Sequence, residues 1–174
     1  HVATLRNARN ENFPDLTDVA YLLKKINVDL ITVHLREDRR HIKDKDLKLL
    51  KKKNFLPLNL EMAATDEMMK ICIDNLPYAC CIVPERREEL TTEGGLDVKN
   101  QLNHLSQFVT KIQNSGIKLS LFIDPDLDQI DAVSKLGVNV VEIHTGKYSR
   151  SFKKRNHKIE LERINRAAEY CSKL

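Results

Sequence analysis

The chain has 174 residues, of which 41% are hydrophobic and 31% are charged, a balance typical of one globular domain. The formal net charge is +4, but only 5% of the residues are aromatic and tryptophan is absent, which argues against nucleic-acid binding. No run of about 18 apolar residues occurs, which excludes a membrane-spanning helix. Four scattered cysteines and the lack of a recognisable secretory leader predict a cytoplasmic protein with reduced thiols.

Short apolar runs alternate along the chain with amphipathic stretches. The runs predict β-strands at residues 30–34, 56–61, 78–83, 117–123 and 138–143. Apolar residues at helical spacing predict helices within residues 19–26, 102–112, 127–133 and 161–171, the second and third of which end near Gly116 and Gly137. Strands that alternate with helices form right-handed βαβ units and a parallel sheet. We therefore expect an α/β fold.

Two α/β architectures fit this order, a (β/α)8 barrel and a doubly wound open sheet. No G-x-G-x-x-G or Walker sequence follows any strand, which argues against the usual nucleotide-binding open sheets. Ionisable residues stand where the predicted strands end, at His34, Glu61, Glu85, Asp124, Glu142 and His144. Because barrel enzymes place their active-site residues at the C-terminal ends of the strands, this pattern favours the barrel.

The densest group of ionisable residues follows the first strand, in the sequence I-T-V-H-L-R-E-D-R-R-H-I at residues 31–42. His34 ends this strand and Glu61 ends the next, so the two side chains should be neighbours and could form an acid–base pair. The alternative is a histidine that only hydrogen-bonds its own loop.

Arginines and a second histidine continue the same segment. Arg36, Arg39, Arg40 and His41 are candidates for binding a phosphate, because guanidinium groups bind phosphate through two parallel hydrogen bonds, and one or two of the three arginines are expected to contact it. Acidic residues among the arginines predict that some of these arginines form salt bridges instead. Near the chain start, Arg6 and Arg9 are most simply interpreted as an exposed basic helical turn.

Two further candidates lie later in the chain. A polar loop, T-T-E-G-G-L-D at residues 91–97, could bind an anion through Thr91 and the backbone N–H groups of its glycines, although an ordinary tight turn is equally compatible. Glu142 and His144 alternate near the end of the last strand and should point to the same side. The histidines lack a spacing typical of metal sites, so no metal is expected.

Several blocks of the sequence, taken in order, resemble one family. They are H-V-A-T-L-R-N-A-R at residues 1–9, the segment 31–42, N-L-E-M at 59–62, V-P-E-R at 83–86, L-T-T-E-G-G-L-D at 90–97, S-L-F-I-D at 120–124 and E-I-H-T-G at 142–146. Over essentially its whole length the chain closely resembles the bacterial pyridoxine 5′-phosphate synthase family.

This resemblance implies a single (β/α)8 TIM-barrel domain over residues 1–174 that is incomplete at both ends, in a protein whose dimers assemble into a homo-octamer. It implies a transferase-type, ring-closing condensation of 1-deoxy-D-xylulose 5-phosphate with 3-amino-2-oxopropyl phosphate. The products would be pyridoxine 5′-phosphate, inorganic phosphate and water. No metal or organic cofactor is implied.

The resemblance also implies roles for individual residues. His34 and Glu61 match the two catalytic bases of the family, and Glu142 matches its transition-state-stabilising carboxylate. The positions that match substrate-binding residues are His1, Arg36, His41 and Thr91 for deoxyxylulose phosphate, and Arg9 for the aminoketone phosphate, which it would reach across a dimer interface.

The sequence also departs from the family pattern. The family has an Asn-x-Asp strand before the position of His1, and a Gly-His-Gly segment with a proton-donating histidine after the position of Leu174; this sequence has neither. We therefore expect it to cover barrel strands two to six and, as an isolated polypeptide, to be inactive and unstable. A non-catalytic phosphosugar-binding barrel is the alternative function. A Schiff-base aldolase is disfavoured, because no lysine ends a predicted strand.

Overall fold

The computed structural model describes residues 2–8, 11–85, 93–152 and 157–174. Its helices are α1 (Val2–Ala8), α2 (Leu16–Lys25), α3 (Asp44–Lys53), α4 (Asp66–Asn75), α5 (Leu102–Asn114), α6 (Leu127–Lys135), α7 (Gly146–Ser151) and α8 (His157–Cys171). Its strands are β1 (Ile31–His34), β2 (Leu58–Met62), β3 (Ala79–Ile82), β4 (Lys118–Ile123) and β5 (Val141–Ile143). Strands and helices alternate through the middle of the chain, as the sequence predicts.

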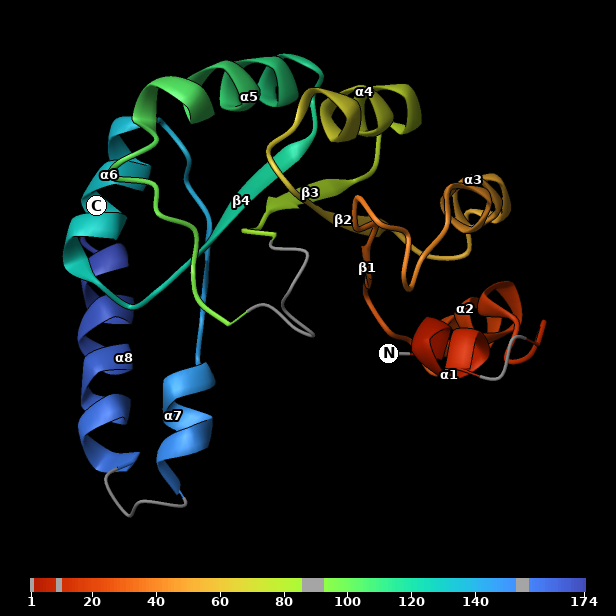
Figure 1. Ribbon diagram of the computed structural model, residues 1–174, viewed down its shortest axis with the longest axis horizontal. Helices are drawn as coiled ribbons and strands as arrows, with labels where there is room; N and C mark the ends of the chain where they lie inside the picture. Colours follow the sequence, from red (N-terminus) through yellow and green to blue (C-terminus); the bar gives the residue numbers. More distant parts are fainter. Residues whose placement is uncertain (1, 9–10, 86–92, 153–156) are drawn as a thin grey trace.

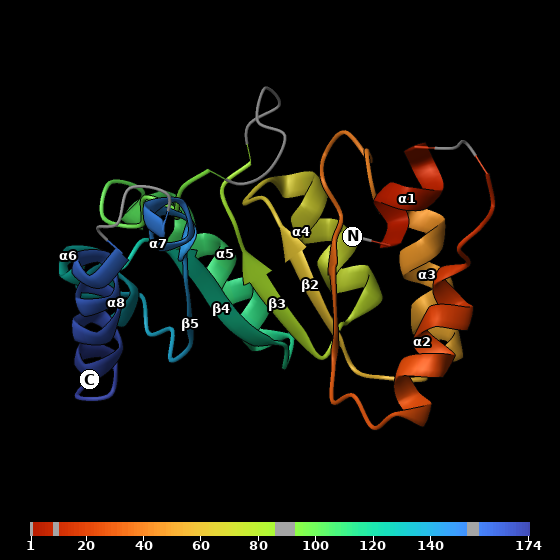
Figure 2. The same ribbon diagram turned by 90° about the horizontal axis from the view of Figure 1, so that it is seen from below.

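The strands form one parallel sheet in the order β1-β2-β3-β4-β5, so each strand pairs with the next strand along the chain. Figure 1 shows the sheet curving, with α3, α4, α5 and α6 along its outer side and α1 and α2 beside β1. In Figure 2 the strands lie side by side with α8 beyond β5. Within the described residues β1 and β5 do not pair with each other, so this parallel sheet is an arc of an unclosed barrel.

The two faces of the sheet have opposite chemistry because side chains alternate along a strand. In β2, Leu58, Leu60 and Met62 belong to the apolar core between the sheet and the outer helices. Asn59 and Glu61, the residues between them, lie on the inner face. The same alternation places His34, Ser120 and Glu142 on the inside of the arc, together with Cys81 and Phe122. The curved sheet therefore carries the ionisable groups on its concave side.

The helix ends follow local sequence rules. Asp15 begins α2 by accepting hydrogen bonds from the backbone N–H groups of Thr17 and Asp18. Gly116 and Gly137 have φ angles of +74° and +70° just after α5 and α6, a conformation in which glycine meets no steric cost. The predicted ends of these two helices are therefore confirmed.

Several features differ from the predictions, which include no helix at the positions of α3 and α4. The strand predicted at residues 138–143 is shorter, since Val138 still bonds back to Val133 as part of the turn that ends α6. The sequence pattern also gave no signal for α7, a helix of six residues without an apolar stripe. Among the described helices, none has the length and apolar character needed to cross a membrane.

Candidate active site

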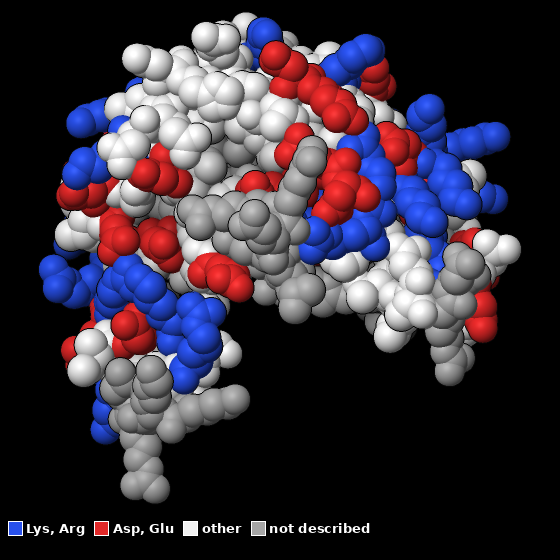
Figure 3. All heavy atoms as spheres, viewed as in Figure 1, with Lys and Arg blue, Asp and Glu red and all other residues white. Residues whose placement is uncertain are grey.

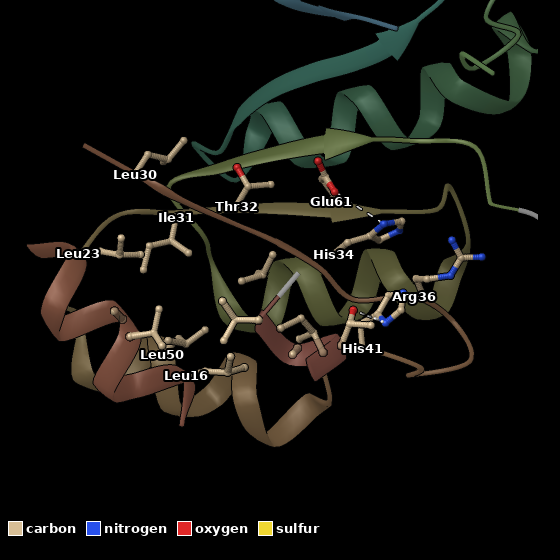
Figure 4. Close-up of a pocket in the computed structure, with 17 residues that line it drawn as sticks. Leu16, Leu23, Leu30, Ile31, Thr32, His34, Arg36, His41, Leu50 and Glu61 are labelled. Atoms are coloured by element: carbon tan, nitrogen blue, oxygen red, sulfur yellow. Dashed lines mark hydrogen bonds and ion pairs between the residues drawn. The ribbon is translucent and has the colours of Figure 1, made fainter. Parts of the chain in front are cut away.

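A cavity of about 580 Å³ opens between β1, α1 and α2. Figure 4 shows that leucines from α2 and α3, Leu16, Leu23 and Leu50, gather at one end of it. Its other end is ionisable and is lined by His34, Arg36, His41 and Glu61. A cavity with one apolar end and a few convergent charged groups is the usual form of a small-molecule site.

His34 and Glu61 are paired positions of β1 and β2, and their side chains point toward one another (Figure 4). The distance from His34 Nδ1 to Glu61 Oε2 is 3.7 Å, too long for a hydrogen bond but short enough for a ligand atom or a small shift to connect them. His34 Nε2 is buried and has no hydrogen-bond partner among the described residues. His34 and Glu61 are therefore neighbours that do not hydrogen-bond each other.

The pKa values of both groups differ from their ordinary values. Burial, together with the positive charges of Arg36 and His41, lowers the pKa of His34 to about 4, so its imidazole is neutral at neutral pH. Burial raises the pKa of Glu61, and the charge of Glu142 raises it further. A neutral imidazole beside a carboxyl group that holds its proton more tightly is suited to passing protons in either direction.

Glu142 lies on β5, on the same inner face as Glu61. The hydroxyl of Ser120, on the neighbouring strand β4, donates a hydrogen bond of 3.0 Å to Glu142 Oε1. Cys81, which is completely buried, is the residue of β3 that pairs with Glu61 on one side and with Ser120 on the other. Our sequence reasoning missed Ser120 and Cys81. The available signal was a small polar residue at an inward position of an otherwise apolar strand.

Arg36 is buried at the mouth of the site and forms an ion pair with Glu85, in which the Nε atom lies 3.1 Å from Oε1. The backbone N–H of Glu37 donates to the same carboxylate at 3.1 Å. Burial raises the pKa of Glu85, while the charge of Arg36 opposes that rise. Arg36 is therefore held in place by a carboxylate from the loop after β3.

The other two arginines of the segment form salt bridges, as the acidic residues around them predict. Arg39 contacts the carboxylates of Asp44 and Glu67, and Arg40 contacts Asp38. In Figure 3 acidic and basic side chains lie intermixed near the ends of the first strands instead of forming a field of one sign. These two arginines consequently shape the loop, and Arg36 is the arginine that lines the cavity.

Helix α1 holds His41 at the cavity. The Thr4 hydroxyl lies 3.0 Å from His41 Nδ1, and the Asn7 amide donates to the carbonyl oxygens of Arg40 and His41 at 2.8 Å each. Arg6 donates to both oxygens of Asp46, at 2.8 and 2.7 Å, and to the His41 carbonyl. The interpretation of Arg6 as an exposed residue is wrong, because only 8% of it is exposed.

A second histidine–carboxylate pair lies at the ends of β4 and β5. His144 Nδ1 lies 2.9 Å from Asp124 Oδ1. Burial would raise the pKa of Asp124, but the hydrogen bonds from His144 and from the Gly95 backbone lower it overall. A Cβ atom on Gly95 would lie 2.0 Å from the Asp124 nitrogen, so only glycine allows this close approach. The pair thereby fixes the described part of the polar loop, residues 93–97, against the sheet.

The structure brings His34, Glu61 and Glu142 to one inner face and places Arg36 and His41 beside the first two of them. His1, Arg9 and Thr91 lie outside the described residues. Within the described ranges, His, Cys, Asp and Glu side chains form no group of three or more that could hold a metal ion.

Known proteins resemble this chain over almost its whole length. Residues 1–174 match the family described as pyridoxal phosphate biosynthesis protein PdxJ. The chain belongs to this family. It is 51% identical over 171 residues to the pyridoxine 5′-phosphate synthase of Blochmanniella floridana, covering 98% of this chain and 69% of that protein. It is 53% identical to that of Ehrlichia chaffeensis and 48% identical to that of Magnetococcus marinus, covering 70% and 71% of those proteins. The family resemblance that the sequence motifs indicate is thus confirmed.

The fold also has relatives among solved structures. A D-psicose 3-epimerase from Clostridium cellulolyticum superposes with a TM-score of 0.50 at 11% sequence identity, over 74% of this chain and 57% of that one. A second D-psicose 3-epimerase structure gives the same score over 75% of this chain. At this identity the likeness concerns the fold alone, and it confirms the α/β architecture of a partial barrel.

Proposed function

We propose that this chain supplies the active-site face of a pyridoxine 5′-phosphate synthase that condenses 1-deoxy-D-xylulose 5-phosphate with 3-amino-2-oxopropyl phosphate. The products would be pyridoxine 5′-phosphate, inorganic phosphate and water. The observation that carries the proposal is the neutral His34 beside Glu61, with Glu142 on the same inner face. The names of relatives that are about half identical support it.

The chemistry fits this group of residues. An amine adds to a ketone to give an imine, and protons must then leave and join several carbon and oxygen atoms before the ring closes. In the proposal, His34 and Glu61 move these protons, and Glu142 stabilises the positive charge that develops on the nitrogen. These groups are half-buried on the inner face, where their charges act more strongly than in water.

Phosphate groups need a separate anchor. Arg36 and His41 lie at the ionisable end of the cavity and would hold the phosphate of deoxyxylulose phosphate, with His1 and Thr91 as further ligands. Arg9 would bind the phosphate of the aminoketone. Anchoring both substrates turns a bimolecular encounter into a positioned reaction, which is a large part of the rate enhancement in such condensations. We further propose a homo-octameric cytoplasmic enzyme that needs no cofactor.

The test is product formation from the two phosphorylated substrates by the intact protein and by its Glu61→Gln variant. We expect the variant to lose about 10²–10⁴-fold in kcat, the usual contribution of an acid–base group, and to bind deoxyxylulose phosphate as the wild type does. Glu169→Gln, on the exposed side of α8, is the matched control and should retain full activity. Binding without any product from the wild type would replace the proposal by a non-catalytic phosphosugar-binding protein.

A further inference from the structure

The carboxylate of Asp124, the residue directly after β4, joins three segments of the chain. One of its oxygens lies 2.9 Å from Nδ1 of His144, the residue directly after β5. The backbone N–H of Gly95, in the loop between β3 and α5, donates a hydrogen bond to the same carboxylate. The ends of β4 and β5 and the loop after β3 therefore meet at one acidic group. Asp124, His144 and Gly95 together form what we call the Asp124 junction.

The charge of Asp124 fixes the direction of these bonds. Burial opposes the charge, but the hydrogen bonds from His144 and Gly95 lower the pKa of Asp124 overall, so the group is a carboxylate at neutral pH. A carboxylate only accepts hydrogen bonds, so His144 donates from Nδ1. The His144 ring also packs against Phe122, with centroids 5.3 Å apart, and a Cβ atom on Gly146 would overlap its Nε2. His144 is thus a donor held in a fixed position.

Backbone hydrogen bonds surround the junction. The N–H of Leu96 donates to the Phe122 carbonyl at 2.7 Å, and the N–H of His144 donates to the Ile123 carbonyl at 2.8 Å. Gly95 approaches the end of β4 so closely that a Cβ atom on it would overlap the Ile123 backbone. The Asp124 side chain therefore completes a contact between the loop and β4 whose other bonds come from the backbone.

The junction also identifies the anion that the glycines of this loop bind. The sequence predicts that the N–H groups of the segment at residues 91–97 could bind an anion. In the structure the N–H of Gly95 binds the carboxylate of Asp124, and a Cβ atom on Gly94 would lie 3.8 Å from Asp124 Oδ2. A substrate phosphate at the same N–H would meet this negative charge. The two glycines therefore anchor the loop to β4.

A second carboxylate fixes the other end of the same loop. Glu85 forms the ion pair with Arg36 at 3.1 Å and accepts the backbone N–H of Glu37. Arg36 lines the ionisable end of the cavity, where a phosphate is proposed to bind. Thr91, the other proposed phosphate ligand of this loop, lies outside the described residues. The loop that holds Arg36 at its first end is thus attached at its second end to Asp124.

We propose that Asp124 is a positioning residue that, together with His144, seats the loop after β3 and so keeps Arg36 in place for the substrate phosphate. Its loss should weaken substrate binding more than the chemical step, because the junction acts on the loop and leaves the strands of His34 and Glu61 unchanged. The inference rests on the proposed function for the identity of the ligand, deoxyxylulose phosphate. The junction itself does not depend on that function.

The experiment compares the wild type with Asp124→Asn, which keeps the size of the side chain and removes its charge, in the intact protein. Asp74→Asn is the matched control, because it removes a carboxylate from an exposed pair with Lys70 on α4. The first readout is the NMR signal of the Gly95 amide and its rate of hydrogen exchange. The second readout is KM and kcat for deoxyxylulose phosphate.

In Asp124→Asn we expect the Gly95 amide proton to shift upfield and to exchange about tenfold faster, because it loses a charged acceptor. KM for deoxyxylulose phosphate should rise about five- to twentyfold while kcat stays within about twofold. A merely structural role would lower the amount of active enzyme, and so kcat, without changing KM. That result, or an unmoved Gly95 amide, would overturn the proposal.

Two variants of His144 cover the case in which Asp124→Asn does not fold. The amide of asparagine can take the place of the imidazole Nδ1, so His144→Asn keeps a donor for Asp124, whereas His144→Ala removes it. KM should rise about threefold in His144→Ala and return to the wild-type value in His144→Asn. Equal KM values in the two variants would also overturn the proposal. If the wild type forms no product, the proposed function is refuted, and the Gly95 amide still decides whether Asp124 seats the loop.

Discussion

The ion pair between Arg6 and Asp46 offers a quantitative test of how α1 is held beside the site. Two hydrogen bonds of 2.8 and 2.7 Å join the groups, and the side chains are only 10% and 5% exposed. Asp46 also accepts the Lys43 backbone N–H at 2.8 Å, which caps α3. Since α1 in turn carries the contacts to His41, losing this pair should loosen both the helix and the histidine.

The perturbation is Asp46→Asn, which keeps the shape and removes the charge. Breaking one side of a fully buried pair costs about 3–5 kcal/mol. Arg6 still reaches solvent at its edge, so we expect about 2–3 kcal/mol here. For a protein of this size that corresponds to a fall in Tm of roughly 5–10 °C. The assay is urea unfolding of the intact protein followed by circular dichroism, combined with Arg6→Met in a double-mutant cycle.

The cost of Asp46→Asn should also depend on pH, in a direction that the pKa of Asp46 predicts. Burial alone would raise the pKa of Asp46, but the hydrogen bonds from Arg6 and Lys43 lower it overall. A carboxyl group with a lowered pKa in the folded state adds stability above its unfolded pKa of about 3.9, and this stability is lost as the pH falls through the folded value. The cost of Asp46→Asn should therefore be largest near neutral pH and shrink toward pH 3.

The control is Asp128→Asn, which removes one side of the exposed pair with Lys99 and should leave stability unchanged within error. A coupling free energy near zero between Arg6 and Asp46 would refute the reasoning. So would an equal cost of Asp46→Asn at pH 7 and at pH 3, because the loss would then come from shape and not from charge.

Three further predictions concern the walls of the site. Thr4→Val should raise KM for the phosphorylated substrate about three- to tenfold, because Nδ1 of His41 loses its contact with the Thr4 hydroxyl. Thr4→Ser keeps the hydroxyl and should keep the wild-type KM. Equal KM values for the two variants would show that this contact does not support substrate binding. Gly95→Ala should destabilise the protein by about 2–4 kcal/mol, because the new Cβ would lie 2.0 Å from a backbone atom. In the control Gly94→Ala the nearest atom would be 3.8 Å from the new Cβ, an ordinary contact. Urea unfolding measures both variants, and similar costs would contradict the close packing at Gly95. The NMR signals of the His34 ring should titrate with a midpoint near pH 4. The free energy of unfolding should fall as the pH drops from about 6.5 toward that value, because the unfolded chain then binds a proton more readily than the folded one. A midpoint above 6 would contradict the burial of this histidine.

Much of the fold could be predicted because it depends on local patterns. The apolar runs predicted each of the five strands in the described part of the chain, and Gly116 and Gly137 marked the ends of two helices. The neighbourhood of His34 and Glu61 could also be predicted, since consecutive strands of a parallel barrel are adjacent and both residues stand at strand ends. These inferences needed the order of the elements and no detail of their packing.

Contacts between distant segments could not be predicted in this way. Arg6 and Asp46 are 40 positions apart, and nothing in either sequence context distinguishes a buried ion pair from two exposed charges. Arg36, in the loop after β1, likewise forms an ion pair with Glu85, in the loop after β3. In both cases the geometry of the loops and of α1 decides which carboxylate lies within reach of a given arginine.

The candidate active site depends finally on strand register. A shift of β2 by one residue would turn Glu61 toward the outer helices and bring Leu60 to the inner face, because side chains alternate along a strand. The register is set by Leu58, Leu60 and Met62, whose burial in the core would be lost by the same shift. At about 1.5–3 kcal/mol for each large apolar side chain, this burial strongly favours the observed register. The apolar residues on the outer face of β2 therefore hold Glu61 in a half-buried position that the carboxyl group itself disfavours, and this partial burial raises its pKa.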